Sequence, residues 1–459
     1  MDEKNIDILA NQPVGKAIFK LAIPMVMGMM VQVFYNLVDT YFIGLLGDAN
    51  QLAAANMAMP IFMLLMGMAS IIGTGASSYI SRSLGKSDYE QANKTTTIAV
   101  CLLLILSVIV TSVGVLACNS IVSALGASGD TFSYTYQYVI IMLLGGVGVM
   151  GNFAFGQLLR AEGNAMMSMM GMVIGTVLNL VLDPLFIFTF DMGVSGAALA
   201  TVIGNMVGFI YYLVCFFRGK TVLKIKFKLF SFDKTIFTEI FKIGLPSSFN
   251  QLLMGGSTLV LNNIAITYGT STVAGMGVAT KIMMIGTFIF IGFSTGCQPL
   301  IGYSYGAGNL SRVKEIIKVG IKLTGTIGIT LFVIFFFTSP FLIKMFTNDP
   351  EVIEKGNIIM RALMWSLPFL GGQMIATATA QSMGKAVAAM ILSISRQGLL
   401  YIPLLLILNS IFGFNGFVYA QAITDILMFV FANIYVSRII NKESQINNLA
   451  TVNLDKKDK

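Results

Sequence analysis

A stripe of polar side chains crosses an apolar stretch near the beginning of the chain and ends in a carboxylate. The stretch reads PMVMGMMVQVFYNLVDTYFIG, and its polar members at i, i+3, i+4 and i+7 are Gln32, Tyr35, Asn36 and Asp39. This spacing puts them on one face of a helix. An ionisable side chain at membrane depth is costly and is normally retained for function, so Asp39 is the first candidate site residue. The alternative is a stripe that only binds this helix to its neighbours.

The segment NLVLDPLFIF contains a second carboxylate in an apolar setting. Asn179 and Asp183 lie four residues apart and share a helix face. Pro184 follows and cannot donate a backbone hydrogen bond, so the carbonyl of Leu180 loses its helical partner. A carboxylate, an amide oxygen and an unpaired carbonyl suit Na⁺ or a shared proton, and Thr201 in the next apolar segment can add a hydroxyl. A helix contact beside a proline kink is the alternative.

Both groups need long helices to carry them, and the composition provides these. The chain has 459 residues, of which 56% are hydrophobic and 11% charged, whereas soluble domains have about 25% charged residues. The apolar runs are continuous rather than alternating, which indicates helices and argues against a β-barrel. We expect an all-α membrane protein with twelve spans, at approximately 17–45, 52–80, 96–118, 134–159, 165–189, 195–217, 240–267, 272–302, 319–338, 357–380, 386–408 and 415–438.

The positive charges indicate how these spans are oriented. With the N terminus inside, 24 of the 29 Lys and Arg residues fall at cytoplasmic ends and loops, as the positive-inside rule requires. We therefore expect a multi-pass protein of the cell membrane, with both termini in the cytoplasm and no nucleic-acid partner. The chain contains no histidine, which excludes a histidine metal site and a histidine proton relay. Carboxylates must then bind any transported proton or cation.

The two halves of the chain resemble each other. At an offset of 221 or 222 residues the matches are Pro24 with Pro246, Thr74 with Thr295, Gly75 with Gly296, and Gly85 with Gly306. Six helices in each half make the repeats parallel, so we expect two six-helix bundles about a pseudo-twofold axis along the membrane normal. The predicted parts are an N-terminal lobe over 1–217, a basic cytoplasmic linker over 218–239, a C-terminal lobe over 240–440 and a disordered cytoplasmic tail over 441–459.

Five short motifs occur in an order and spacing that is specific in combination. They are SRSLGKSDYEQA, LLRAEGNA, NLVLDPLFIF, GVSGAALAT and QPLIGYSYGAGN. With them, nearly the whole chain resembles the multidrug and toxin extrusion (MATE) transporters, in the branch of the DNA-damage-inducible F and MepA-type pumps. The resemblance implies twelve helices in two lobes and cation-coupled export of organic cations and drugs.

The resemblance also implies that the carboxylates of the first and fifth spans meet in a polar network of the N-terminal lobe. The positions that match this network are Tyr35, Asp39, Asn179, Asp183 and Thr201. The coupling ion is H⁺ or Na⁺, and a Na⁺ site would use Asp39, Asn179 and Asp183. No other cofactor is expected.

Further polar positions are candidates for contacts with this network or for flexibility. Gln157 in the fourth span and Asn36 in the first are candidate additional contacts. Pro24 and Pro184 are candidate hinges, because proline removes a helical hydrogen bond.

The C-terminal half offers fewer charges within its spans. The segment QLLMGGSTLVLNN of the seventh span has no acidic residue, although another MATE branch has one there. Asp425 matches Asn205 at an offset of 220 residues and is a candidate second ion or drug contact. For Arg396 and Lys281 we expect contacts with backbone carbonyls, or charged groups that extend to the membrane interface.

These observations favour a cation-coupled exporter that binds small organic cations, lies in the lipid bilayer and acts as a monomer. The alternative is a flippase for a lipid-linked oligosaccharide, which should line its cavity with several Arg or Lys residues to bind pyrophosphate. An enzyme is not expected, because the chain has no histidine, no acidic pair motif and no serine–base arrangement. The chain also has no Walker motif, which excludes ATP-driven transport by this polypeptide.

Overall fold

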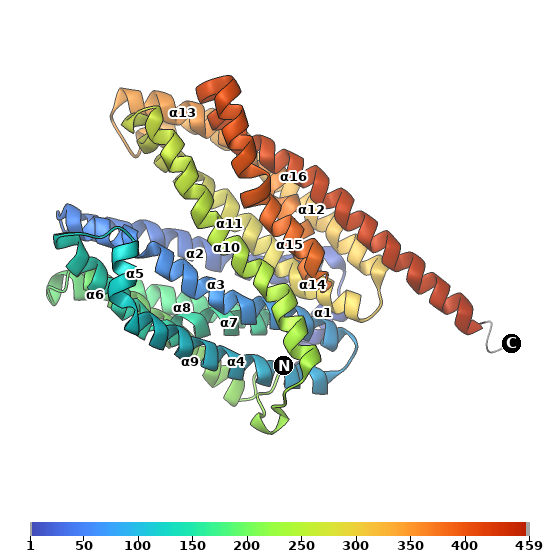
Figure 1. The fold of residues 1–459 in the computed structure, drawn as a ribbon. Coiled ribbons are helices and arrows are strands. Elements are labelled where there is room, and N and C mark those ends of the chain that lie inside the picture. The colour runs from blue at the N-terminus through green and yellow to red at the C-terminus, as the bar shows by residue number, and fades with distance from the viewer. Residues whose placement is uncertain (1, 456–459) are drawn as a thin grey trace.

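The computed structural model describes residues 2–455, and helices account for nearly all of that range (Figure 1). A short helix, α1 (Asp2–Ala10), precedes the apolar spans. The N-terminal lobe consists of α2 (Val14–Gly44), α3 (Ala49–Gly85), α4 (Tyr89–Leu116), α5 (Cys118–Ala124), α6 (Asp130–Leu144), α7 (Gly146–Ala161), α8 (Ala165–Pro184), the π-helical turn η1 (Leu185–Thr189) and α9 (Val194–Phe217). The C-terminal lobe consists of α10 (Lys234–Thr267), α11 (Thr270–Gly306), α12 (Leu310–Lys344), α13 (Pro350–Met364), α14 (Leu367–Ser382), α15 (Ala386–Ile394), the π-helical turn η3 (Ser395–Leu399) and α16 (Tyr401–Asp455).

These helices provide the twelve predicted spans. Eight helical stretches are long and apolar enough to cross a membrane, and two bent pairs raise this number to ten. The pairs are α6 with α7, bent by 52°, and α13 with α14, bent by 48°, so the fourth and tenth spans are kinked. The stretch Ala386–Ile446 contains a break at Gly413, where φ is 56°, and therefore holds two spans. The helix α10, which is less apolar, provides the remaining span.

Glycines with positive φ recur at the offsets that the sequence repeat predicts. Gly163 and Gly384 follow α7 and α14 with φ of 81° and 73°. Gly193 and Gly413 begin the last span of each half with φ of 54° and 56°. A positive φ strains residues that carry a Cβ, whereas glycine adopts it readily. The repeat of glycines therefore reflects a repeat of backbone conformation.

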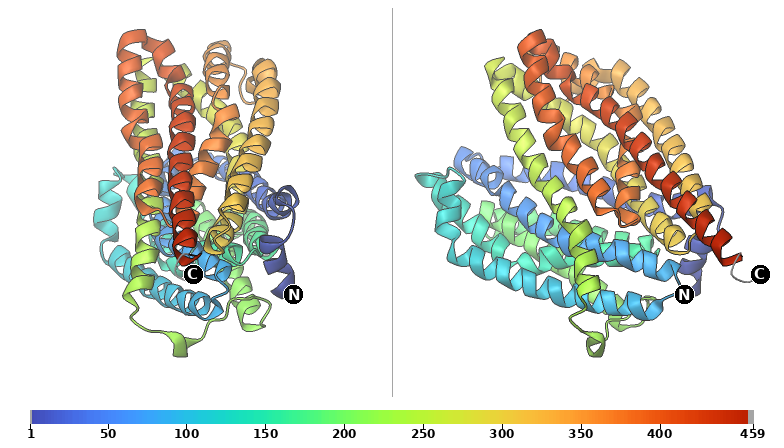
Figure 2. Two further views of the ribbon diagram at one scale, coloured as in Figure 1. Left: turned by 90° about the vertical axis from the view of Figure 1, so that its right-hand side faces the viewer. Right: turned by 45° about the vertical axis from the view of Figure 1, so that its right-hand side comes forward.

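The two lobes form layers of helices that converge at one end of the molecule and diverge at the other (Figures 1 and 2). The short helix α1 and the C-terminal part of α16 lie near the converging end. There α3 and α11 cross at backbone distance: a Cβ on Gly85 would lie 2.1 Å from the carbonyl oxygen of Tyr303, and one on Gly306 2.1 Å from that of Arg82. The two contacts are equivalent in the repeat, so the pseudo-twofold axis passes through this crossing.

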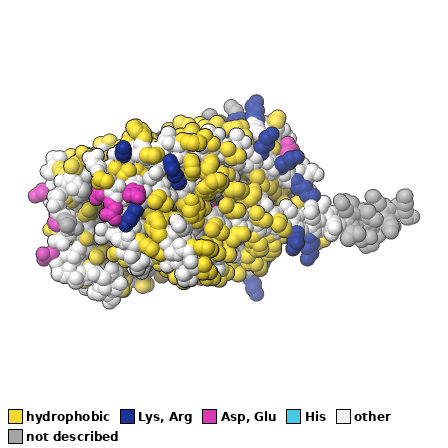
Figure 3. Space-filling view, turned by 90° about the horizontal axis from the view of Figure 1, so that it is seen from above, with side chains coloured by type: hydrophobic (Ala, Val, Ile, Leu, Met, Phe, Trp, Pro, Cys, Tyr) yellow, Lys and Arg dark blue, Asp and Glu magenta, His cyan; other side chains and the backbone are white. Residues whose placement is uncertain are grey.

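The surface has the character of a membrane protein. Figure 3 shows hydrophobic side chains over much of one face between the ends, and most of the visible Lys and Arg side chains toward one end. Large apolar residues such as Val108 and Phe337 are more than half exposed. A soluble protein seldom exposes apolar surface on this scale, whereas lipid requires it.

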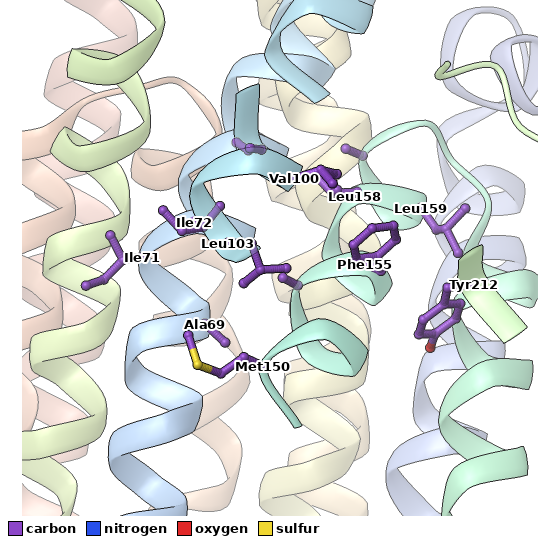
Figure 4. Close-up of a cluster of buried hydrophobic side chains, with 14 of the residues drawn as sticks. Ala69, Ile71, Ile72, Val100, Leu103, Met150, Phe155, Leu158, Leu159 and Tyr212 are labelled. Atoms are coloured by element: carbon purple, nitrogen blue, oxygen red, sulfur yellow. The ribbon is translucent and has the colours of Figure 1, made fainter. Parts of the chain in front are cut away.

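A packed core within the N-terminal lobe holds α9, the helix that carries Thr201 of the candidate site. Side chains from α3, α4, α7 and α9, among them Ile72, Leu103, Phe155 and Tyr212, are buried together (Figure 4). The Phe155 ring centroid lies 5.1 Å from that of Phe209, in an edge-to-face contact. These contacts hold α7 and α9 in a fixed relation.

The linker between the lobes is attached to the N-terminal lobe. The backbone N–H of Leu223 donates to Glu162 over 3.0 Å, and that of Lys226 donates to Thr97 over 3.1 Å. Residues 234–239, predicted as linker, belong to α10, because Asp233 caps the helix by accepting from the N–H of Thr235 over 3.0 Å. A hydrogen bond from Lys94 lowers the pKa of Asp233 and keeps the cap ionised.

The prediction of a disordered tail is wrong for the part of the tail that the structure describes. The helix α16 continues beyond the last span to Asp455, and residues 456–459 lie outside the described range. Glu443 anchors the beginning of this extension, since its carboxylate pairs with Lys385 over 2.5 Å and accepts from the Tyr305 hydroxyl over 3.1 Å. The composition is polar enough for disorder, but these contacts stabilise the first turn of the extension.

Candidate functional site

Asp39 and Asp183 meet in the N-terminal lobe, as predicted. They lie near the C-terminal ends of α2 and α8, away from the end where the lobes converge, and Asp183 is fully buried. Their carboxyl groups lie close enough to interact electrostatically, and neither oxygen of Asp183 has a hydrogen-bond donor among the described residues. Two ionised carboxylates so placed repel each other, and a proton or a cation bound between them relieves that repulsion. The site therefore has the geometry of a carboxyl pair that shares a proton or a cation.

Three further predicted residues surround this pair. The Asn179 side-chain amide donates to the hydroxyl of Thr201 over 3.1 Å, and that hydroxyl shares a hydrogen bond with the Tyr35 hydroxyl over 3.2 Å. Asn179 and Thr201 are buried on α8 and α9, and Tyr35 is one helical turn before Asp39 on α2. The network thus joins α2 to α8 and α9, two neighbouring helices that follow much later in the sequence.

Several oxygens of the network have no hydrogen-bond donor among the residues that the structure describes. They are Oδ1 of Asp39, Oδ1 and Oδ2 of Asp183, and Oδ1 of Asn179. Buried polar atoms are normally paired, so each of these oxygens needs a proton, a water or a cation. The set fits Na⁺ or a shared proton, because all its atoms are oxygens. It does not fit a transition metal site, and no group of three or more His, Cys, Asp and Glu occurs within the described part of the chain.

Other residues complete the network and were missed in the sequence. Tyr138 on α6 lies close enough to interact electrostatically with both Asp39 and Asp183. Asn205 donates to the carbonyl of Thr201 over 2.9 Å and accepts from Asn152 of α7 over 3.0 Å. A signal for Asn205 was available, because it follows Thr201 by four residues and so shares its helix face. Tyr138 and Asn152 had no such signal.

The predicted additional contacts and hinges remain predictions. Gln157 packs against Gly73 of α3 with a buried Oε1 that no described residue donates to, and no contact joins it to the carboxyl pair among the described residues. Asn36 is half-buried on the stripe of α2. The helix α2 continues through Pro24, and α8 reaches Pro184 before the π-helical turn η1 begins.

The C-terminal lobe has a buried ion pair instead of an open carboxyl pair. Asp425 is fully buried, accepts from Nε of Arg396 over 2.9 Å, and accepts from the Gln421 amide over 3.1 Å. The expectation that Arg396 contacts backbone carbonyls or the interface is therefore wrong. Both Asp425 oxygens are occupied here, so this residue is not an open ion contact in this structure. Lys281 is exposed.

Removing Asp425 alone is expected to destabilise the fold. Arg396 would be left as a mostly buried charge without its partner, and breaking a buried pair costs about 3–5 kcal/mol. In detergent, Asp425→Asn should lower Tm more than the double variant Arg396→Met with Asp425→Leu, which removes both charges. A single variant as stable as the native protein would contradict a structural role and return Asp425 to the candidate ion contacts.

Known proteins match this chain over almost all of its length. The MatE family model matches residues 24–185 and again residues 246–407, once in each half. The multidrug export protein MepA of Staphylococcus aureus (strain MSSA476) is 34% identical over 427 residues, 93% of this chain and 94% of that protein. A crystal structure of MATE in complex with MaL6 has a TM-score of 0.93 at 29% identity, and covers 96% of this chain and 99% of its own. A MOP superfamily transporter from Pyrococcus furiosus Vc1 (DSM3638), described by a binding pocket of reverse polarity that suggests a different function, has a TM-score of 0.91 at 29% identity and the same coverage.

Proposed function

Because this chain belongs to the MatE family of membrane transporters and is not an enzyme, we propose that it exports small organic cations and drugs in exchange for H⁺ or Na⁺. The observation that carries the proposal is the pair Asp39 and Asp183, in which Oδ1 of Asp39 and both oxygens of Asp183 are buried without a donor among the described residues. Such a pair at membrane depth is expensive unless it binds an ion. The name of the S. aureus relative, a multidrug export protein, supports drugs as the substrate class.

The carboxyl pair provides a physical route to coupling. Two carboxylates in contact within an apolar bundle repel each other, so the pair holds a proton or Na⁺ whenever no organic cation compensates its charge. Binding of H⁺ or Na⁺ then weakens the attraction for a cationic drug, and binding of the drug weakens that for the ion. Tyr35, Asn179 and Thr201 connect this change to α2, α8 and α9 through their hydrogen bonds.

The orientation follows from the charges. We place the converging end of the lobes in the cytoplasm of the cell, with both termini, because Lys and Arg gather there (Figure 3). With this orientation, the carboxyl pair lies toward the outside of the cell. The chain acts as a monomer in this proposal, since each lobe has a hydrophobic core of its own.

A flippase is the second candidate, and the C-terminal lobe argues against it. Pyrophosphate recognition needs several free Arg or Lys side chains in the cavity. The intramembrane Arg396 is already neutralised by Asp425, which leaves Lys281 as the other basic residue predicted within the spans. Export of cations is therefore the better-supported function.

The test is ethidium efflux from proteoliposomes, with pH and Na⁺ gradients imposed separately. We expect one gradient to drive efflux and its collapse by an ionophore to stop it. The gradient that works identifies the coupling ion. Absence of efflux of any organic cation under either gradient would contradict the proposal and favour the flippase.

A further inference from the structure

The lobes meet along two lines of contact that the repeat makes equivalent. One line, the polar seam, is α3 against α10 and α14; the other, the apolar seam, is α1 and α2 against α11 and α12. At the offset of 222 set by Pro24 and Pro246, Glu239, Ser247 and Ser248 of the polar seam correspond to Ala17, Met25 and Val26 of the apolar seam. The two seams share a geometry but differ in chemistry.

Hydrogen bonds and an ion pair cross the polar seam, beside buried contacts of Ile236 and Ile240 of α10 with the core of the N-terminal lobe. Arg82 of α3 pairs with Glu239 of α10 over 2.7 Å, and their side chains are 14% and 19% exposed. The Ser78 hydroxyl donates to the carbonyl of Gln381 over 2.5 Å. A small cavity, with room for about one water molecule, lies in the seam and is lined by Thr74, Ser77, Ser78, Ser81, Gln298, Gln381 and Ser382.

Buried aliphatic and aromatic side chains hold the apolar seam together. One hydrophobic cluster contains residues of both α2 and α11. Its members Ile18, Leu21 and Leu300 are each at most 1% exposed. Phe19 and Phe293 add an edge-to-face ring contact across the seam, with centroids 6.3 Å apart. No pair of opposite charges bridges α2 and α11 among the residues that the structure describes.

The helix α1 provides a second set of contacts between the two lobes at the apolar seam. Leu9 is fully buried, and its side chain lies within van der Waals reach of Gly163 in the N-terminal lobe. Arg312 of α12, in the C-terminal lobe, donates to the carbonyls of Leu9 over 3.2 Å and Gln12 over 2.7 Å. The α1 segment thus contacts both lobes on this side.

We propose that the lobes separate on the cytoplasmic side along the polar seam, with the apolar seam as the hinge, and that exported cations enter there. Separating the polar seam exchanges its hydrogen bonds for bonds to water, which costs little free energy per bond, and also exposes Ile236 and Ile240 of α10. Separating the apolar seam exposes a larger set of buried apolar side chains from α2 and α11, and the cost in free energy grows with the apolar area exposed. The opened polar seam presents hydroxyls, amides and the Glu239 carboxylate to an incoming cation.

This inference rests on the proposed export function, and cross-linking separates the two. In a background without native cysteines, Ser78→Cys with Ser382→Cys bridges the polar seam, and Phe19→Cys with Phe293→Cys bridges the apolar seam. A short, reducible thiol cross-linker should stop ethidium efflux in the first pair, and reduction should restore it. The second pair should retain at least half of its efflux after cross-linking. Efflux that survives in the first pair, or stops in the second, would overturn the inference, whereas failure of the reduced proteins to export would count against the function.

A labelling experiment tests the seams without needing export. Cys297 is a native, fully buried residue of the apolar seam, and Ser77 lines the polar cavity. Ser77→Cys is introduced into a variant that keeps Cys297, and a charged, membrane-impermeant thiol reagent is added from the cytoplasmic side. This reagent should label Ser77→Cys at least tenfold faster than it labels Cys297. Equal labelling rates, or faster labelling of Cys297, would refute the hinge.

Discussion

Replacing Asp183 with asparagine is expected to slow gradient-driven export strongly in a protein that still folds. Asparagine has nearly the same shape as the protonated carboxyl, but it cannot release a proton or provide a charge to Na⁺. Asp183 is fully buried, and neither of its oxygens has a donor among the described residues. If coupling amounts to 1–3 kcal/mol, its loss lowers the efflux rate under a gradient by roughly 5- to 150-fold.

The measurement is the initial rate of ethidium efflux, with ethidium binding in detergent and Tm recorded for the same preparation. Asp39→Asn should behave like Asp183→Asn, because each removes one half of the pair. Asp130→Asn is the matched control, since Asp130 is an exposed residue at the beginning of α6. Native efflux rates in both pair variants would move coupling away from the N-terminal lobe.

Replacing Gly244 with alanine is expected to prevent the cytoplasmic closure of the lobes. A Cβ at this position of α10 would lie 1.8 Å from the carbonyl oxygen of Ile71 on α3, and a backbone atom cannot move away as a side chain can. Ile71 lies in the N-terminal core region of Figure 4, which holds α3 in place. The variant should therefore accumulate with its cytoplasmic side open and export at less than about one tenth of the native rate, because a clash of 1.4 kcal/mol or more shifts the equilibrium tenfold or more.

Gly256→Ala is the matched control on the same helix, because no atom lies within 4 Å of the place that a Cβ would take there. Thermal unfolding should show both variants folded, and thiol labelling at Ser77→Cys from the cytoplasm should rise in the Gly244 variant alone. Native efflux with Gly244→Ala would mean that α3 and α10 approach less closely in the working protein than in this structure.

The repeat and the position of the carboxylates could be predicted from the sequence. A constant offset between Gly85 and Gly306 reflects a contact that each makes with the other half, and the structure confirms it. Helical spacing correctly put Asn179 and Asp183 on one face, and the MATE resemblance implied that Asp39 would meet them. Local periodicity identifies a helix face but does not identify the helix that this face contacts. The prediction that Asp39 and Asp183 lie together therefore came from the family resemblance.

The remaining parts depend on contacts between distant segments. Arg396 and Asp425 lie on different spans, and no pattern in either span indicates a partner of opposite charge. Tyr138 is one of several tyrosines on α6, and nothing in their spacing indicates which of them lies near the carboxyl pair. The early start of α10 did have a local signal, because Asp233 occupies the capping position. The apolar pattern begins only later, so it did not indicate this start.

The attachment of the linker to the N-terminal lobe has a consequence for how the protein is made. Glu162, Asn93 and Thr97 hold the linker backbone at Leu223, Lys224 and Lys226, and all six residues are synthesised before α10 begins. The first half therefore already contains the partners that hold this part of the linker. It can complete its packing in the membrane while the second half is still being translated, and the second half then inserts beside a finished template.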